Sequence, residues 1–280
     1  MQEFQLAFAS NSKIWKANIT KRLRRRSSAE GHLRARRLRY RPRSCANRQN
    51  LKSLISSQLR RSFSNSLSST PNMRNILCFG DSNTWGYVPI TGERFPHSIR
   101  WTGVLREHLG KNYWVIEEGL NGRTTVHNEE ERPFRSGREI LPAILESHRP
   151  LDLAVIMLGT NDLKSRFHST PQDISIGVKS VCENALDFSK INGFEMQVLL
   201  VSPPCLNDMP KEDQALFSGA TKKSLELAHC YESVAEALGI SFLDAGEIVK
   251  TNTLDGVHWD AIQHKDFGKA LSHLILTMLE

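Results

Sequence analysis

The feature that most constrains the fold is a regular alternation of short apolar stretches and longer amphipathic ones after residue 73. The apolar stretches are typical of buried strands, and they cover residues 74–80, 113–119, 151–159, 196–204 and 240–246. Helical spacing of apolar residues predicts helices over 99–110, 138–148, 174–192, 222–239 and 261–279. Strands that alternate with helices form parallel sheets covered on both faces. The sequence therefore predicts an α/β protein, a three-layer α/β/α sandwich in a single domain over residues 73–280.

The distribution of charge divides the chain into two parts. Residues 1–72 hold 17 Lys and Arg against only Glu3 and Glu30, which leaves 20 basic and 28 acidic residues for the rest. A nucleic-acid-binding domain needs a basic surface, so the acidic second part argues against nucleic acid as a partner. Its longest apolar run, Leu153–Leu158, is far shorter than the roughly 20 residues that cross a bilayer. No membrane span is expected.

The basic first part has the composition of a mitochondrial transit peptide. It is rich in Arg and Ser and almost free of acids, residues 51–63 have the pattern of an amphipathic basic helix, and RSFS at 61–64 resembles a matrix-processing site. A second interpretation stays open, because Met73 begins a natural protein start. Under it, residues 1–72 are a gene-model extension without function. The first interpretation predicts a mitochondrial protein and the second a cytoplasmic one.

The cysteines show no pattern of a metal site or of a disulfide framework. They are odd in number and form no CxxC pair or Cys/His cluster: Cys45, Cys78, Cys182, Cys205 and Cys230. Reduced thiols are the simplest interpretation. Cys78 is expected to be a buried strand residue.

Polar clusters follow four of the predicted strands, and the carboxyl ends of parallel strands meet at one edge of the sheet. The clusters are GDSN at 80–83, GLNGRTT at 119–125, GTND at 159–162 and DGVHWD at 255–260. A serine hydroxyl becomes a nucleophile when an imidazole accepts its proton and an acid holds the other ring nitrogen. Ser82, His258 and Asp255 supply these groups, and the Ser82 and Gly122 N–H groups and the Asn161 amide are candidate oxyanion donors. This set of a serine, a histidine, an acid and amide donors predicts acyl transfer through Ser82.

Structural roles compete for several of these residues. Asp255 could cap the final helix, Asn161 could form an Asx-turn, and a turn needs glycine at 122 whether or not it binds an oxyanion. Support of loops or turns through hydrogen bonds is expected for Asp81, Arg123 and Asp162.

Aromatic and irregular segments near the clusters suggest where the substrate lies. Trp85 and Trp259 adjoin the expected catalytic residues and are candidates for lining a substrate pocket, with the core as the alternative. Trp101 is expected in the core or at its rim, and His264 on the exposed side of the final helix. The proline-rich segment 203–219 fits either a lid or an oligomer contact.

The four clusters resemble the four sequence blocks of the GDSL-type, or SGNH, hydrolases. GDSN, NGRTT, GTND and DGVH occur in the family's order, and ILCFGDSNTWGY, RWTGVL and VSPP resemble its bacterial arylesterase/acyltransferase branch. The resemblance implies a flavodoxin-like sheet, no metal or organic cofactor, and ester hydrolysis through an acyl-serine. It also implies that Ser82 is the nucleophile, His258 the base and Asp255 the partner of that base. The oxyanion donors that it implies are Ser82, Gly122 and Asn161. Asn83 departs from the family's name-giving motif, which has Leu there.

The sequence thus predicts a serine esterase that acts on small aryl or short-chain alkyl esters. Transfer of the acyl group to an alcohol is the alternative, because tryptophan-rich surroundings would give a drier pocket. A flavodoxin-like binding protein without turnover is a third interpretation, although no glycine-rich phosphate loop occurs. The expected partners are a small-molecule ester and, since relatives often form homo-oligomers, further copies of the chain.

Overall fold

The computed structural model describes residues 73–279, and in them five parallel strands form one sheet. The strands are β1 (Arg74–Gly80), β2 (Tyr113–Gly119), β3 (Leu153–Met157), β4 (Gln197–Ser202) and β5 (Ser241–Asp244). They lie in the order β2-β1-β3-β4-β5, which is the flavodoxin-like order. The predicted parallel sheet is confirmed. The predictions for residues 1–72 lie outside the described residues.

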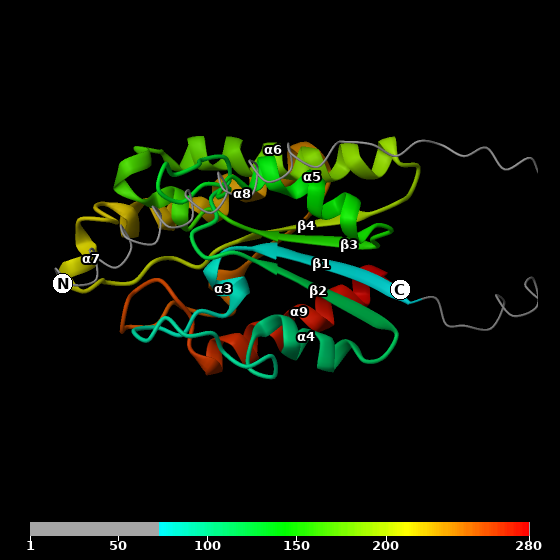
Figure 1. Ribbon diagram of the computed structural model, residues 1–280, viewed down its shortest axis with the longest axis horizontal. Coiled ribbons are helices and arrows are strands. Elements are labelled where there is room, and N and C mark those ends of the chain that lie inside the picture. Colours follow the sequence, from blue (N-terminus) through cyan, green and yellow to red (C-terminus); the bar gives the residue numbers. More distant parts are fainter. Residues whose placement is uncertain (1–72, 280) are drawn as a thin grey trace, which may run out of the picture. The chain divides into compact units, whose positions relative to one another are not determined.

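Five long helices cover the two faces of the sheet. They are α4 (Trp101–Leu109), α5 (Gly137–His148), α6 (Pro171–Ile191), α8 (Ala220–Leu238) and α9 (Ala261–Leu279). Helices α5, α6 and α8 lie on one face, and α4 and α9 lie on the other (Figure 1). Shorter segments complete the described part: α3 (Ser82–Trp85), α7 (Lys211–Gln214), and the 3₁₀ turns Asn161–Leu163, Ser165–Phe167 and Ala245–Glu247. The three predicted layers are confirmed.

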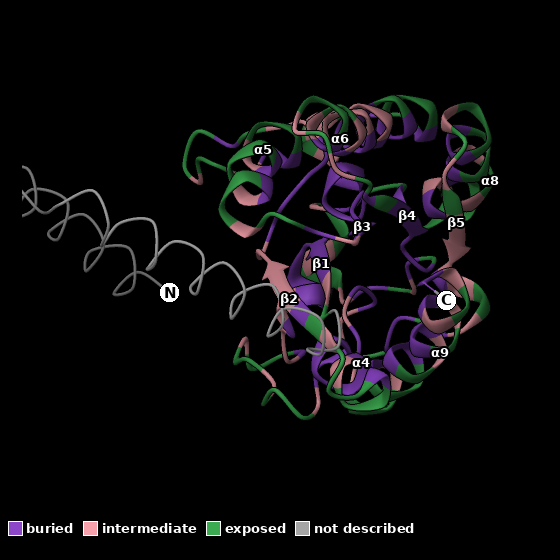
Figure 2. Cartoon of the chain, turned by 90° about the vertical axis from the view of Figure 1, so that its right-hand side faces the viewer, coloured by how far each residue is buried: buried purple, intermediate pink, exposed green. Residues whose placement is uncertain are grey.

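The core is split by the sheet into two hydrophobic clusters. Along β1, Leu77 and Phe79 enter the cluster under α5, α6 and α8, whereas Ile76 and Cys78 enter the cluster under α4 and α9. The buried strands lie between helices whose exposed residues face outward (Figure 2). A sheet buried on both faces needs apolar residues at successive positions, which explains the continuous runs in the sequence. Cys78 is buried, as predicted.

Helix α5 contains a proline and still begins within one residue of its predicted start. The hydroxyl of Ser136 accepts a hydrogen bond from the backbone N–H of Glu139 and caps the helix, so Pro142 lies inside it. Proline cannot donate to the carbonyl four residues before it. The Asn184 side chain of α6 supplies that missing donor, at 2.8 Å from the carbonyl oxygen of Arg138. The helix predicted over residues 138–148 is therefore confirmed, with Pro142 inside it.

His264 is buried, and its expected exposure is wrong. Its side chain lies on the face of α9 that packs against α4, where its Nδ1 accepts a hydrogen bond from the Trp101 N–H at 3.3 Å. The ring also makes edge contacts with Phe95 and Trp259. Burial lowers the pKa of His264 to about 3, so the imidazole is neutral in the core.

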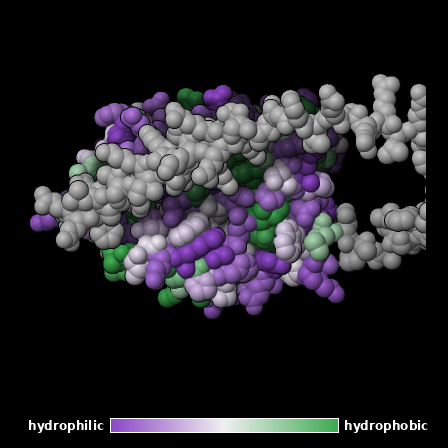
Figure 3. Space-filling model, in the orientation of Figure 1, coloured by the Kyte–Doolittle hydropathy of each residue, from purple (hydrophilic) through white to green (hydrophobic). Residues whose placement is uncertain are grey.

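On the visible part of the face shown in Figure 3, hydrophobic residues lie in several patches separated by hydrophilic ones. None of the helices within residues 73–279 has both the length and the hydrophobicity needed to cross a membrane.

Candidate active site

The candidate site lies outside the carboxyl ends of β1 and β3, where the strand order reverses. Neighbouring chain connections leave in opposite directions at such a point and open a crevice. A pocket of about 510 Å³ lies there, and residues from all four polar clusters line it. Ser82 follows β1, Asn161 follows β3, and both are among the lining residues.

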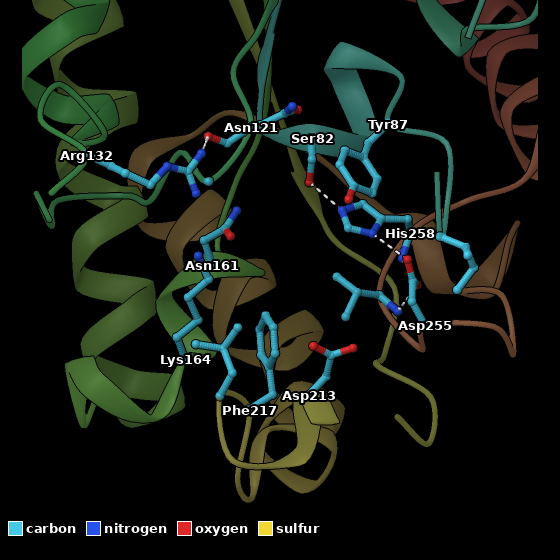
Figure 4. A pocket seen from close by; sticks show the side chains of 14 residues that line it. Ser82, Tyr87, Asn121, Arg132, Asn161, Lys164, Asp213, Phe217, Asp255 and His258 are labelled. Atoms are coloured by element: carbon cyan, nitrogen blue, oxygen red, sulfur yellow. Dashed lines mark hydrogen bonds and ion pairs between the residues drawn. The ribbon is translucent and has the colours of Figure 1, made fainter. Parts of the chain in front are cut away.

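Ser82 is held in the sharp turn that leads from β1 into α3. The carboxylate of Asp81 accepts a hydrogen bond from the Asn83 N–H at 3.0 Å and caps this short helix. Burial raises the pKa of Asp81. The Asp81 side chain is thus bonded to the backbone of the turn, and the Ser82 hydroxyl is directed into the pocket, toward His258 (Figure 4). The expected structural role of Asp81 is confirmed.

Ser82, His258 and Asp255 form one hydrogen-bonded chain. The Nε2 atom of His258 lies 2.9 Å from the Ser82 Oγ, and its Nδ1 lies 2.7 Å from Oδ2 of Asp255. An Nδ1–H that donates to the carboxylate leaves Nε2 free to accept the serine proton. Tyr87 stacks on the imidazole with ring centroids 4.2 Å apart. The structure thus joins residues that lie 176 positions apart in the chain.

The Asp255 carboxylate accepts its hydrogen bonds from the histidine loop and does not cap α9. Burial alone would raise its pKa, but hydrogen bonds from the His258 ring and from the N–H groups of His258 and Val257 outweigh burial and hold the pKa below its ordinary value. Asp260 instead accepts hydrogen bonds from the first turn of α9, at 2.8 Å from the Ile262 N–H. The competing interpretation of Asp255 as a helix cap is wrong.

The candidate oxyanion donors converge on the other side of Ser82. Gly122 has a φ of +80°, a conformation that residues with a Cβ rarely adopt. Its N–H and that of Ser82 have no hydrogen-bond acceptor among the described residues. The Asn161 amide donates one hydrogen to the Arg123 carbonyl at 3.1 Å, which leaves its second N–H available to a ligand. The three predicted donors are therefore together at the pocket.

Arg123 and Asp162 fix the loops that carry these donors. The Arg123 guanidinium donates to the carbonyls of Gly80, at 2.7 Å, and Glu118, so it ties the ends of β1 and β2 together. Burial lowers its pKa to about 10. Asp162 accepts hydrogen bonds from the N–H and hydroxyl of Thr125, at 3.0 and 2.5 Å. Both residues have the loop-supporting roles predicted for them.

Residues 78–265 match the GDSL-like lipase/acylhydrolase family. The chain belongs to this family. The match spans all four clusters, from the serine turn to the histidine loop, and confirms the resemblance seen in the sequence.

Two solved structures to which the chain is similar are esterases. An inhibitor-bound aryl esterase from M. smegmatis is 41% identical, with a TM-score of 0.71 over 74% of this chain and 100% of that one. A carbohydrate acetylesterase from Sinorhizobium meliloti is 38% identical, with a TM-score of 0.71 over 74% and 100% of the two chains. A comparison with curated proteins found no match. The family match and these neighbours identify the chain as an ester-hydrolysing enzyme.

Asn83, where the GDSL motif has Leu, has a role that the sequence did not reveal. Its side-chain oxygen accepts a hydrogen bond from the Trp259 N–H at 3.1 Å, and its amide donates to the Val257 carbonyl at 3.3 Å. These two backbone groups flank His258. Asn83 therefore fastens the histidine loop to the turn that carries the nucleophile.

The two tryptophans proposed for the substrate pocket do not line it. Trp259 is fully buried beneath the histidine loop, where it packs against Phe267. Trp85 is half-buried and lies outside the pocket, with the Arg94 guanidinium over its ring. Neither indole is therefore in a position to contact a substrate in this pocket. Trp101 lies in the core, as expected.

The pocket has a charged wall that no motif indicated. Arg132 and Lys164 line it, and the segment 203–219 contributes Asp213, Leu216 and Phe217. Figure 4 shows Arg132 and Lys164 on one side of the cavity, and Asp213 beside Phe217. Segment 203–219 thus supplies part of the pocket wall.

The described residues contain no group of three or more His, Cys, Asp or Glu side chains arranged to hold a metal ion. Cys78, Cys182, Cys205 and Cys230 are free thiols. Burial raises the pKa of Cys182 to about 12, so this thiol stays protonated.

Proposed function

We propose that the protein is a serine esterase that hydrolyses small acyl esters through an acyl-serine intermediate. The observation that carries the proposal is the contact of 2.9 Å between the Ser82 Oγ and the His258 Nε2, with unpaired amide donors beside it. The aryl and carbohydrate ester substrates of the two similar enzymes support small esters as the substrate class.

The first step forms a bond between Ser82 and the acyl group. His258 Nε2 accepts the hydroxyl proton while Oγ attacks the ester carbonyl, and Asp255 stabilises the resulting imidazolium. The carbonyl oxygen becomes an oxyanion that the N–H groups of Ser82 and Gly122 and the Asn161 amide stabilise. Each such donor contributes about 2.7–4 kcal/mol to the transition state in enzymes where it was removed.

The second step releases the acyl group to water. Acylation ends when the imidazolium gives its proton to the alcohol oxygen and the ester C–O bond breaks, and the neutral His258 then removes a proton from a water molecule. Attack of that water on the acyl-serine breaks the bond between the acyl carbon and Oγ, and His258 returns the proton to Oγ, which forms the acid and restores the Ser82 hydroxyl. One ester and one water are consumed, and one acid and one alcohol are formed.

Replacement of the nucleophile tests this proposal. We expect Ser82→Ala to lower kcat for p-nitrophenyl acetate at least about a thousandfold, because loss of a catalytic serine costs more than this in a well-studied protease. Ser136→Ala is the matched control, since it removes a buried hydroxyl that caps α5 and does not line the pocket. A fluorophosphonate probe should label the wild type and the control but not Ser82→Ala. Turnover by Ser82→Ala close to that of the control would refute the proposal.

Acyl transfer to an alcohol is not favoured by the pocket that the structure shows. The sequence argument for transfer was a dry, tryptophan-rich site, but neither Trp85 nor Trp259 lines the pocket. The charged Arg132 and Lys164 side chains lie there instead. We expect acid to be the main product of p-nitrophenyl acetate in dilute methanol, and measurement of methyl acetate against acetate decides between the two reactions.

A further inference from the structure

Arg132 lies directly behind the candidate oxyanion site. A Cβ atom at residue 122 would lie 2.9 Å from its Nη1 and 3.0 Å from its Nη2. Its Nη2 donates to the Asn121 carbonyl at 2.8 Å, and this hydrogen bond keeps the guanidinium against the pocket wall (Figure 4). The backbone N–H of Arg132 donates to the Glu129 carbonyl, whereas the remaining guanidinium N–H groups have no acceptor among the described residues.

Two other cations close to Arg132 share the buried carboxylate of Glu129. Glu129 binds the Lys164 Nζ at 3.4 Å through one oxygen and the Arg166 Nη1 at 3.2 Å through the other. Within residues 73–279, Arg132 itself has no carboxylate within ion-pair distance. Burial lowers the pKa of Lys164, Glu129 opposes this, and the charges of Arg132 and Arg166 lower it further. The cluster therefore has more positive than negative charge, and Arg132 is the member of it without a carboxylate partner.

The geometry of the reaction decides which part of the substrate meets this wall. The departing alcohol oxygen has to face His258, which protonates it, and the oxyanion has to face Gly122 and Asn161. Arg132 lies on the side of Ser82 that is remote from His258 (Figure 4). A substrate group that reaches Arg132 thus belongs to the acyl part and not to the alcohol.

The geometry points to an ester whose acyl chain ends in a carboxylate, a half-ester of a small dicarboxylic acid, bound through Arg132. The inference rests on the proposed esterase function and names its substrate class. A guanidinium binds a carboxylate through two parallel hydrogen bonds, and the free N–H groups of Arg132 are suited to that contact. Asp213, near Phe217 and away from Arg132, would repel the same carboxylate from the other wall and so favour one orientation.

A pair of esters of equal chain length tests this inference. p-Nitrophenyl hemiglutarate carries a terminal carboxylate, whereas p-nitrophenyl valerate has the same five-carbon acyl chain without charge. We expect Arg132→Gln to lower kcat/KM for the hemiglutarate at least about tenfold more than kcat/KM for the valerate, since a hydrogen bond to a charged group is strong. Added salt should reduce the wild-type ratio of hemiglutarate to valerate turnover.

Arg166→Gln is the matched control, because it removes an equal charge from the same cluster but Arg166 does not line the pocket. This control should leave the ratio of the two esters within about twofold of the wild-type ratio. A measurement on the wild type alone complements the variants: free glutarate should inhibit valerate hydrolysis competitively and more strongly than butyrate does.

Each remaining outcome has a distinct meaning. An equal loss on both esters in Arg132→Gln would overturn the inference and show that the guanidinium acts on the oxyanion or the loop. Wild-type preference for the valerate, or equal inhibition by glutarate and butyrate, would also overturn it. Failure of the wild type to hydrolyse any aryl ester would refute the esterase function itself.

Discussion

At the scale of single residues, the site depends on side chains that fix the backbone of its loops through hydrogen bonds. Asn83 shows this most directly. It bridges the nucleophile turn and the histidine loop through the Val257 carbonyl and the Trp259 N–H. Neither hydrogen bond touches the reacting atoms, so Asn83 is a positioning residue. Its effect on catalysis has to pass through the placement of His258.

We predict that Asn83→Leu slows acylation because the histidine loop loses both anchors. The family motif has Leu here, so a side chain of this size is accommodated in related folds, and what changes in this chain is the loss of two buried hydrogen bonds. A buried group left without its partner costs about 1–3 kcal/mol. We expect kcat/KM for p-nitrophenyl acetate and the rate of fluorophosphonate labelling to fall by about tenfold.

Asn75→Leu separates this positioning effect from general destabilisation. Asn75 lies in β1, the strand that leads to the turn of Asn83, but near the end of β1 remote from that turn, where its amide donates to the Pro150 carbonyl at 3.0 Å. The control should lower the melting temperature and leave the labelling rate unchanged. If both variants label at the wild-type rate, Asn83 does not position His258.

At the scale of elements, α5 shows how a helix tolerates an internal proline. The Arg138 carbonyl loses its intrahelical donor to Pro142, and Asn184 of α6 replaces that donor. The contact also joins two helices on the same face of the sheet. A tertiary hydrogen bond from α6 thus replaces the hydrogen bond that the proline removes from α5.

A double-mutant cycle tests this compensation. Asn184→Ala alone should lower the free energy of unfolding by about 0.5–1.5 kcal/mol, because it leaves the carbonyl to water. In a Pro142→Ala background the helix regains its own N–H donor at position 142, so Asn184→Ala should cost less there. Urea unfolding of the four proteins gives the coupling energy. A coupling of zero would mean that Asn184 does not replace the missing donor.

The long elements of the fold could be predicted from the sequence, and the short ones could not. Strands such as β3 are continuously apolar because both faces are buried, and α9 was predicted with its observed bounds, Ala261–Leu279. Helix α3 has four residues, too few to show a helical period. His264 was placed on the surface because sequence spacing does not reveal that α4 covers that side of α9.

At the scale of the whole molecule, the catalytic part of the site could be predicted because the order and direction of the strands determine where its residues lie. Parallel strands bring their carboxyl ends to one edge, so Ser82, Gly122, Asn161 and His258 were predicted to meet although the sequence separates them widely. Arg132 escaped prediction because it comes from a loop without a motif, and its place beside Gly122 depends on how that loop folds back. Which charged side chains line the pocket therefore depends on tertiary contacts and cannot be read from the spacing of residues in the sequence.

Asp162 makes the free energy of unfolding depend on pH. Burial raises the pKa of this carboxyl to about 7, although the hydrogen bonds from Thr125 lower it. An unfolded Asp has a pKa of about 3.9. Between about pH 4 and pH 7 the folded protein therefore keeps a proton that the unfolded chain releases. The free energy of unfolding contributed by this group is highest below pH 4 and decreases as the pH rises through that window.

We predict that Asp162→Asn removes this dependence, because an amide does not titrate. The difference in free energy of unfolding, variant minus wild type, should rise in favour of the variant between pH 4.5 and 7 and level off above it, with a slope of at most about 1.36 kcal/mol per pH unit. Urea unfolding at a series of pH values measures it. Asp173→Asn is the control: hydrogen bonds from Thr170 lower the pKa of Asp173, so its difference should stay constant from pH 5 to 8. A flat difference for Asp162→Asn as well would show that Asp162 is ionised throughout this range in the folded protein.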